Sequence, residues 1–481
     1  MNMTELLRKH PLYDANIKTW NYYRDSYEGG TAYEKAALLY QYAYEAASDA
    51  GSANKYNTRI QQTPLDNQCK SSLHTYSSYL WRRKPQRDLG HLADNLEALK
   101  LLADADLEGT SINEFMRHVE LMAHVYGHTW IVMDKSPEHY RTLAQERRAG
   151  VRPYMVRYDP PSVWNWEIRR SNSGELELNY LKVAEIETDY LGNEKTTIRI
   201  WTKEKIEVYA FGPGETKAEL EPTLTTANRL GIIPAVCHYS RTKTAQGVGA
   251  SEITDVAKMQ QSIYNDLSEM HQSIRNANHN TLVKNADDEA TTGAGGVIIM
   301  ASQTEANKKP YLLQSQIFQL NGLINCINKK DDMINRMTHL APVRNQRNQT
   351  FSGEAQKTEF QLLNALLNEM AASLQTTEVK LFSILCKWLR KPNAFYSIVI
   401  IYPQKFELRD SKSDIELLKE AKALNVQSET YQKEVDKLIA SITLEDDAQL
   451  EQIQGEIQKA SYTVAPTPAP AQAAPAGAAA A

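Results

Sequence analysis

The sequence predicts a mainly helical α+β protein in which one stretch of strands separates two helical parts. Apolar residues recur at three- and four-residue spacing up to about residue 125 and again from Ser251 onward. Between these parts lie short alternating runs separated by Gly, Pro and charged turns, a pattern typical of antiparallel strands. The chain has 481 residues, 42% of them hydrophobic, which is enough for a sizeable core and for two to four domains.

The N-terminal part is expected to contain three helices. The stretch Ala32–Ser48 is rich in Ala, Tyr, Leu and Glu and holds no helix breaker, and a second helical stretch covers Asn67–Trp81. A third covers Ser111–His124. It starts on a residue suited to an N-cap, and Glu114 follows three residues later, which is the capping-box spacing.

The middle of the chain predicts a small antiparallel sheet. A strand is expected over His128–Met133, followed by the aromatic, Pro-punctuated segment Arg152–Trp166. Three alternating runs then cover Tyr180–Ile186, Thr196–Trp201 and Ile206–Phe211. Their alternation predicts strands with one buried face.

Two periodic helices follow, over Ser251–His279 and Gln316–His339, on either side of a short strand-bearing region, Thr281–Leu313. That region surrounds an acidic turn made by Asp287, Asp288 and Glu289. The apolar positions expected to pack the two helices are Ile263, Leu267, Met270, Ile324, Ile327 and Ile334. Four methionines on these helices, Met259, Met270, Met333 and Met337, suit either adaptable contacts between copies or an ordinary core.

The remaining chain predicts one long helix, one strand and a helical end. Glu354–Lys391 contains neither Pro nor Gly and carries a stripe of large apolar residues. A strand is expected over Tyr396–Tyr402 and helices over Asp414–Ile442. Beyond Lys459 the chain is uncharged and built largely of Ala, Pro and Thr, so we expect disorder there.

Composition restricts the function classes. A formal net charge of −5 does not fit a tight nonspecific duplex-DNA binder, which is usually strongly basic. No apolar run of about 18 residues and no signal-peptide h-region occur, so we expect no membrane helix and assembly in the cytoplasm. Cys69, Cys237, Cys326 and Cys386 are widely spaced. That spacing predicts reduced thiols rather than a zinc site or disulfides.

No motif predicts catalysis, a cofactor or a metal site. The chain has no P-loop and no G-x-S-x-G elbow, and the glycines Gly293, Gly295 and Gly296 precede a strand instead of a phosphate-binding helix. His124 and His128 are four residues apart, but Gly127 intervenes and no H-E-x-x-H motif is present. We therefore interpret them as ordinary, partly buried histidines and expect that the protein is not an enzyme.

A basic loop between the second periodic helix and the long helix is the one segment whose residues suggest contact with a ligand. From Leu340 to Gly353 the chain has two arginines and no acid, within the run Arg344, Asn345, Gln346, Arg347 and Asn348. Arginine and amide side chains of this kind can touch phosphates transiently. The alternative is an exposed polar loop without a ligand, because two arginines are a weak signal.

The order helix, strand-bearing insert, helix, polar loop and very long helix resembles the portal proteins of tailed bacteriophages. Local strings add to this resemblance: GIIPAVCHYSRTK before the first periodic helix, FSGEAQKTEF at the start of the long one, and RPYMVRYDPPSVWNW upstream. The resemblance covers Thr63 to Leu438. It implies a dodecameric ring at one capsid vertex of the virion, with double-stranded DNA passing nonspecifically through its centre.

The resemblance also implies partners and a division of the chain. The partners would be the terminase large subunit, the head–tail adaptor, and capsid and scaffold proteins, with no membrane. The parts would be the wing (1–250), first stem helix (251–279), clip (280–315), second stem helix (316–339), tunnel loop (340–352), a long wing or crown helix with a strand (353–402), crown helices (403–459) and an Ala/Pro tail (460–481).

Carried onto this sequence, the resemblance assigns roles to two groups of polar residues. The tunnel-loop residues Arg344, Asn345, Gln346, Arg347 and Asn348 would face the DNA channel. The clip residues Asp287, Asp288, Glu289, Lys308 and Lys309 would meet the motor and the adaptor. The alternatives are another phage head–tail connector or minor capsid protein, a nucleic-acid enzyme, or a cytosolic helical scaffold.

Overall fold

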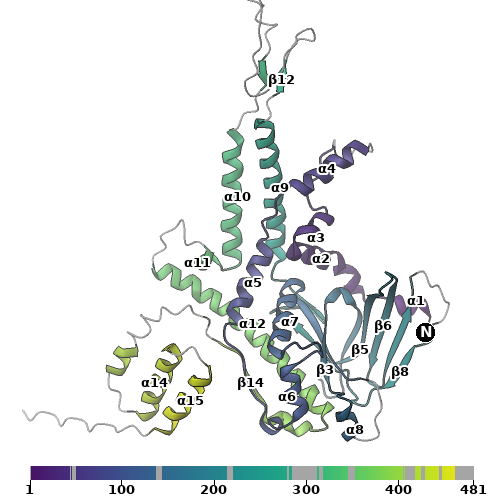
Figure 1. Ribbon diagram of the computed structural model, residues 1–481, viewed down its shortest axis with the longest axis vertical. Helices are drawn as coiled ribbons and strands as arrows, with labels where there is room; N and C mark the ends of the chain where they lie inside the picture. Colours follow the sequence, from purple (N-terminus) through teal and green to yellow (C-terminus); the bar gives the residue numbers. More distant parts are fainter. Residues whose placement is uncertain are drawn as a thin grey trace, which may run out of the picture. The chain divides into compact units, whose positions relative to one another are not determined.

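The computed structural model describes residues 2–43, 45, 50–136, 143–213, 220–278, 281–283, 311–313, 318–344, 353–404, 406, 418–423, 428–443 and 447–460. The chain forms two compact units, Met1–Phe406 and Glu407–Ala481 (Figure 1). The first unit contains all the described strands and the helices α1 to α12. The architecture is therefore mixed helix and sheet, with helices in the majority, as the sequence predicts.

The helices of the N-terminal part follow their capping signals. They are α1 (Met3–Leu7), α2 (Pro11–Glu28), α3 (Gly30–Lys35), α4 (Ala50–Gln62), α5 (Gln68–Leu80), α6 (Leu96–Ala103) and α7 (Ile112–Tyr126). Ser111 Oγ accepts a hydrogen bond from the Glu114 amide at 3.3 Å, so the predicted N-cap of α7 is confirmed. The prediction of α5 is also confirmed, with Asn67 as its N-cap.

The prediction of one helix over Ala32–Ser48 is wrong. α3 ends at Lys35, and Ala37 has a φ of +50°. Beyond it the backbone is held by tertiary hydrogen bonds, because the Tyr40 amide donates to Asn265 Oδ1 at 2.7 Å and Arg59 donates to the Tyr40 carbonyl. Tertiary contacts here override the helical propensity of the local sequence.

The middle of the chain is antiparallel sheet, as predicted, but it forms two sheets where the sequence predicts one. The larger has the order β4 (Val163–Arg170), β5 (Leu176–Thr188), β6 (Glu194–Thr202), β7 (Lys205–Phe211) and β8 (Leu224–Ala227). The smaller has β2 (His128–Asp134) between β3 (Tyr154–Tyr158) and β9 (Ala235–Tyr239). Short elements complete this region: β10 (Lys243–Ala245), β11 (Val248–Gly249) and α8 (Leu143–Arg148).

Three long helices follow. They are α9 (Thr254–Asn278), α10 (Phe318–Met337) and α12 (Gly353–Trp388), and they confirm the helices expected in these places. The strands β12 (Thr281–Val283) and β13 (Tyr311–Leu313) pair with each other, and the one-turn helix α11 (Ala341–Arg344) follows α10. The strand expected over Tyr396–Tyr402 is shorter, because Pro392–Ser397 forms a 3-10 helix. Only β14 (Val399–Ile401) pairs, with β1 (Gln86–Asp88).

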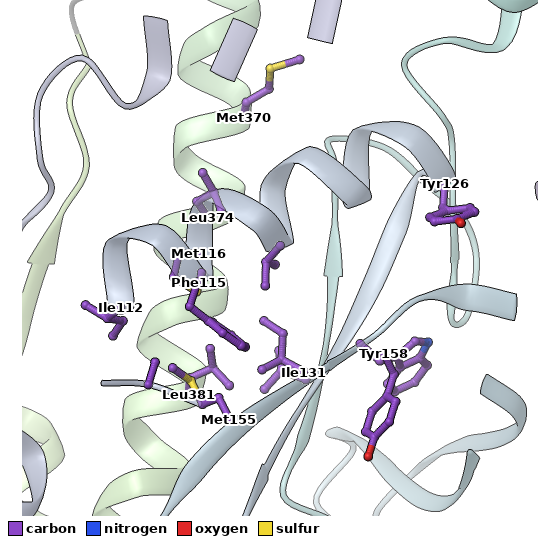
Figure 2. Close-up of a cluster of buried hydrophobic side chains, with 14 of the residues drawn as sticks. Ile112, Phe115, Met116, Tyr126, Ile131, Met155, Tyr158, Met370, Leu374 and Leu381 are labelled. Carbon is purple, nitrogen blue, oxygen red and sulfur yellow. The ribbon is translucent and has the colours of Figure 1, made fainter. Parts of the chain in front are cut away.

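The core of the first unit lies where α12 crosses α7 and the smaller sheet. Figure 2 shows Phe115 and Met116 of α7 beside Leu374 and Leu381 of α12, with Ile131 of β2 close by. The predicted α12 stripe is buried at Leu363, Leu367, Met370, Leu374, Leu381 and Leu385, and Phe360 and Trp388 are partly buried. Each buried side chain of this size contributes about 1.5–3 kcal/mol, so α12 is the main support of the unit.

The second unit is a small helical assembly. α14 (Glu429–Thr443) and α15 (Asp447–Lys459) pack together, and Val435 of α14 is buried. The helical prediction for this part is confirmed where the structure describes it, while the tail from residue 461 lies outside the described residues. Over the part of the chain that is described, no helix combines the length and apolar character needed to cross a membrane.

Candidate functional site: the α9–α10 helix pair

α9 and α10 lie side by side and antiparallel, with the β12–β13 ladder beyond their far ends (Figure 1). One cation joins them across the pair. Lys330 of α10 forms an ion pair with Asp266 of α9 and donates to Ser262 Oγ at 2.7 Å. These polar contacts of Lys330, together with apolar contacts, fix how α9 and α10 align along their length.

α9 is embedded in the first unit over its lower half. Ile263 is 1% exposed, and Gln260, which is fully buried, bridges two neighbouring helices. The Gln260 side chain donates to the Ser26 carbonyl of α2 at 2.9 Å and accepts from the Cys69 amide of α5 at 2.9 Å. Because a buried amide left unpaired costs about 1–3 kcal/mol, these bonds hold α9 specifically against α2 and α5.

α10 is far more exposed than its partner. Ile334 is fully buried near the base, but Ile324, Met333 and Met337 are 40–42% exposed. Met333 and Met337 are four residues apart and share one face of α10, whereas Ile324 lies on the opposite flank of the helix. The exposed apolar face of α10 is therefore the one that carries Met333 and Met337.

Two glycines allow the end of α7 to pack closely against the segment that precedes α9. Gly127 ends α7 with a φ of +89°, and its backbone packs against that of Gly249 in β11. A Cβ on Gly127 would lie 2.3 Å from the Gly249 carbonyl oxygen, and a Cβ on Gly249 would lie 2.1 Å from the Gly127 oxygen. Only glycine fits at either position, because any larger residue would force the two segments apart.

A buried polar chain runs beside this crossing. Glu120 Oε1 lies 2.6 Å from His124 Nε2, and the other ring nitrogen of His124 is 2.6 Å from Ser240 Oγ. The Ser240 hydroxyl donates to Glu252 Oε1 at 2.7 Å, and Glu252 pairs with Arg241 at 2.7 Å. Burial raises the pKa of Glu252, but the hydrogen bonds from Arg241 and Ser240 and the electrostatic effects of His124 and Arg241 together outweigh it, so that pKa is lowered.

The order carboxylate, histidine, serine resembles a hydrolytic triad, yet its geometry excludes that role. Ser240 is 1% exposed and its hydrogen is committed to Glu252, so no substrate reaches it and the histidine does not receive its proton. These hydrogen-bonded side chains instead link α7 to Ser240, which follows β9, and to Glu252, which precedes α9. It is a structural bridge between the helix pair and the sheets.

At the base of α10, Arg344 is tied to the neighbouring helix. Its guanidinium donates to Ser71 Oγ at 2.7 Å and to Gln68 Oε1 at 2.9 Å, both on α5. The predicted loop over 340–352 therefore begins with buried Leu340 and a helical turn, not with extended polar chain. Whether Arg344 also meets DNA stays a prediction, but in this structure its guanidinium serves the contact between α11 and α5.

Next to Arg344 lies a carboxyl group with an unusual pKa. Burial raises the pKa of Asp331 to about 6, with further contributions from the negative charges of Asp66 and Asp332, while Arg344 opposes the shift. The buried Oδ1 atom of Asp331 has no hydrogen-bond partner among the described residues. The base of α10 therefore carries a charge that the fold compensates poorly.

The predicted packing residues divide into two groups. Ile263 and Ile334 are buried, and Leu267, Met270 and Ile327 are partly buried, whereas Ile324 is exposed in the single chain. The other predicted site residues lie outside the described residues: Asp287, Asp288, Glu289, Lys308, Lys309, Asn345, Gln346, Arg347 and Asn348. Their proposed roles stay predictions.

His124 and His128 are both buried, and each has its own environment. Burial lowers the pKa of His128 to about 3, so this ring is neutral, whereas the His124 ring lies 2.6 Å from a Glu120 oxygen. The i, i+4 spacing of Glu120 and His124 on one helix was a readable signal for that pair. Nothing in the sequence pointed to Ser240 or Glu252. Over the described residues, no three His, Cys, Asp or Glu side chains cluster as metal ligands.

Comparison with known proteins gives structural neighbours but no sequence family. Neither a family model nor a curated protein matches the chain. Among solved structures, a chain from the neck of an empty gene transfer agent particle aligns with TM-score 0.40 and 11% identity, over 74% of this chain and 86% of that one. A chain from the virion of a native gene transfer agent particle aligns with TM-score 0.41 and 10% identity, over 75% and 87%. These scores are too low to establish a shared fold.

Proposed function

We propose that this protein is a phage portal protein, a subunit of a closed ring at one capsid vertex through which viral DNA is packaged and later ejected. Its place would be the virion, after assembly in the host cytoplasm. The terminase large subunit would dock on the ring first and the head–tail adaptor afterwards, with capsid and scaffold proteins around it. We also propose that it is not an enzyme and needs no cofactor.

The observation that carries this proposal is the unequal exposure of the α9–α10 pair. α9 is embedded in its own subunit through Gln260 and Ile263, while α10 leaves Ile324, Met333 and Met337 open. In a ring of side-by-side pairs, the open face of one pair would be covered by the next copy. Cyclic assembly requires such a heterologous contact between two different faces.

The net charge of the chain supports a channel through which DNA slides more than a protein that binds DNA tightly. Each contact between a cation and a phosphate strengthens DNA binding and would resist sliding. The chain has a net charge of −5, and the described cations of the helix pair are partly occupied, as in the ion pair between Lys330 and Asp266. Weak, nonspecific contact with passing DNA is the expected result.

The test is electron microscopy of the purified chain, with averages of top views. Closed rings with an open centre and about twelve-fold symmetry are expected. Monomers or dimers at every protein and salt concentration tried would contradict the proposal. Rings that cleave DNA or hydrolyse ATP would contradict the part that excludes an enzyme.

A paired substitution tests whether α10 supplies the contact. Met333→Glu with Met337→Glu places two charges on the exposed apolar face and should abolish rings while the subunit stays folded, because both side chains are open to solvent. The control is Asn325→Glu with Asn328→Glu, which adds the same charge at two exposed polar positions of α10. Rings that survive the methionine changes would remove α10 from the interface.

A further inference from the structure

The turn between β5 and β6 presents three strongly exposed large apolar side chains, among them Tyr190, the most exposed of the described residues of this kind. Tyr190 is 95% exposed, Leu191 69% and Ile186 68%. We call residues 186–194 the hairpin tip. Such exposure of three neighbouring large side chains has no function within one subunit and marks a contact site for another molecule.

The hairpin tip is held rigid by one side chain. Asp189 accepts hydrogen bonds from the Leu191 and Asn193 amides, each at 2.8 Å, and Gly192 takes the left-handed φ of +85° that the turn needs. Below the turn, β5 and β6 pair without a break from Thr188 and Glu194 to Tyr180 and Thr202. A preorganised tip loses little conformational entropy on binding, which is the property of a docking element.

A cleft of complementary character lies at the other end of β5. It has a volume of about 580 Å³ and is lined by, among others, Arg8, Lys9, Trp166, Ile168, Arg169 and Tyr180. We call it the N-terminal cleft, because residues 8–12, which follow α1, form one wall. Ile168 and Tyr180 are its partly buried apolar lining, whereas Trp166 is only 3% exposed because the ring of His10 stacks on it with centroids 4.2 Å apart.

The charges of the two surfaces are opposite. The hairpin tip carries the exposed acids Glu187, Asp189 and Glu194 and no base, although Lys195 lies just beyond it, opposite Glu187 in the ladder. The rim of the cleft has Arg8, Lys9 and Arg169 against the single acid Glu167, which pairs with Arg169 at 2.5 Å. Opposite potentials on two surfaces favour their encounter and fix its orientation.

The hairpin tip cannot fill the cleft of its own chain. From Tyr180, which lines the cleft, to Thr188 at the tip, β5 is a continuous paired strand. At about 3.3 Å per residue these positions are roughly 26 Å apart. A tip and a cleft that match each other but lie this far apart on one chain are what a head-to-tail contact between copies requires.

We propose that the hairpin tip of one copy docks in the N-terminal cleft of the next copy, with Tyr190 and Leu191 against Ile168 and Tyr180 and the tip acids against Arg8 and Lys9. This contact adds a second interface to the proposed ring, and its repetition around a closed circle rests on that proposed function. It is separate from the contact of α10 and uses none of the same residues.

Two variants of the full chain test the contact through its association. Tyr190→Ser with Leu191→Ser should raise the dissociation constant between copies roughly tenfold or more, as loss of an aromatic anchor does. The control Tyr396→Ser, at a residue that is 87% exposed and far from both surfaces in sequence, should leave the constant unchanged. Mass photometry over a dilution series measures both, and equal association of the hairpin variant and wild type would overturn the proposal.

Charge exchange and cross-linking give independent outcomes. Arg8→Glu with Lys9→Glu should weaken association, as should Glu187→Lys with Glu194→Lys, and the four changes combined should restore it. In chains with Cys326→Ser, which removes the exposed native thiol, a copy with Tyr190→Cys should form a disulfide with a differently tagged copy carrying Asn165→Cys. Rings without this cross-link would overturn the hairpin contact alone. The cross-link in open oligomers, without rings, would support the contact and contradict the ring.

Discussion

α9 and α10 have similar apolar spacing in the sequence and different surroundings in the structure. Ile263 of α9 is 1% exposed, because α2 and α5 cover that helix, whereas Ile324 of α10 is 40% exposed. α9 is therefore part of the subunit's own core, while α10 keeps large apolar side chains exposed that the proposed ring would cover. The comparison teaches that helical periodicity identifies an apolar face without saying which molecule covers it.

The largest expected effect lies at the base of α9. Gly127→Ala should destabilise the first unit by about 3 kcal/mol, because it combines a positive φ with a Cβ placed against the Gly249 backbone. The matched change on the other helix is Gly322→Ala, where the added Cβ meets open space and should stabilise α10 by about 0.5–1 kcal/mol. Urea unfolding followed by circular dichroism compares the two, and equal effects would contradict the difference between the helices.

A second pair of substitutions compares the two isoleucines directly. Ile263→Ala should cost about 2–4 kcal/mol of subunit stability, as deletion of a buried side chain does. Ile324→Ala should cost less than about 1 kcal/mol in the isolated subunit, because its side chain is largely solvated. Measured below the concentration at which copies associate, a large loss for Ile324→Ala would mean that α10 is covered within its own chain.

Much of the fold follows from local sequence, but the site does not. The N-cap at Ser111 and the Pro- and Gly-free run of α12 predicted their helices correctly, because caps and breakers act within one turn. Ala32–Ser48 failed, because Arg59 and Asn265 hold its backbone from distant parts of the chain.

The base of the helix pair could not have been predicted from spacing. His124 meets Ser240 across 116 residues of sequence, and Arg344 meets Ser71 across 273. Contacts between residues this far apart are set by packing of whole elements, which no local period encodes. For the same reason Arg344, chosen as a loop cation, turns out to be bonded to α5.

The two arginines of the predicted tunnel loop should therefore separate in experiment. Arg344→Ala should lower subunit stability by about 1–2 kcal/mol, because Ser71 and Gln68 lose their partner. Arg347→Ala should leave stability unchanged and alter DNA packaging if the loop faces the channel. Arg336→Ala, an exposed arginine of α10, is the control. Thermal unfolding and packaging of capsids measure the two effects, and unchanged packaging in Arg347→Ala would contradict a DNA-facing role.

The smallest expected effect is a pH dependence confined to the base of α10. The pKa of Asp331 is raised to about 6 from a usual 3.8, so folding favours its protonated form. The stabilisation that this gives is complete below about pH 4 and is lost as the pH rises through 6. Asp331→Asn should therefore raise the Tm relative to wild type at pH 7.5, and the difference should shrink toward pH 4. The control is Asp331→Glu, which keeps a carboxyl group at this position and should therefore keep the pH dependence.

Glu252, which lies just before α9, offers the contrast, because its pKa is lowered, in part by the hydrogen bond from Arg241. Glu252→Gln should accordingly lower the Tm at pH 7.5. A higher Tm for this variant would mean that the fold destabilises the charged form of Glu252 as it does that of Asp331.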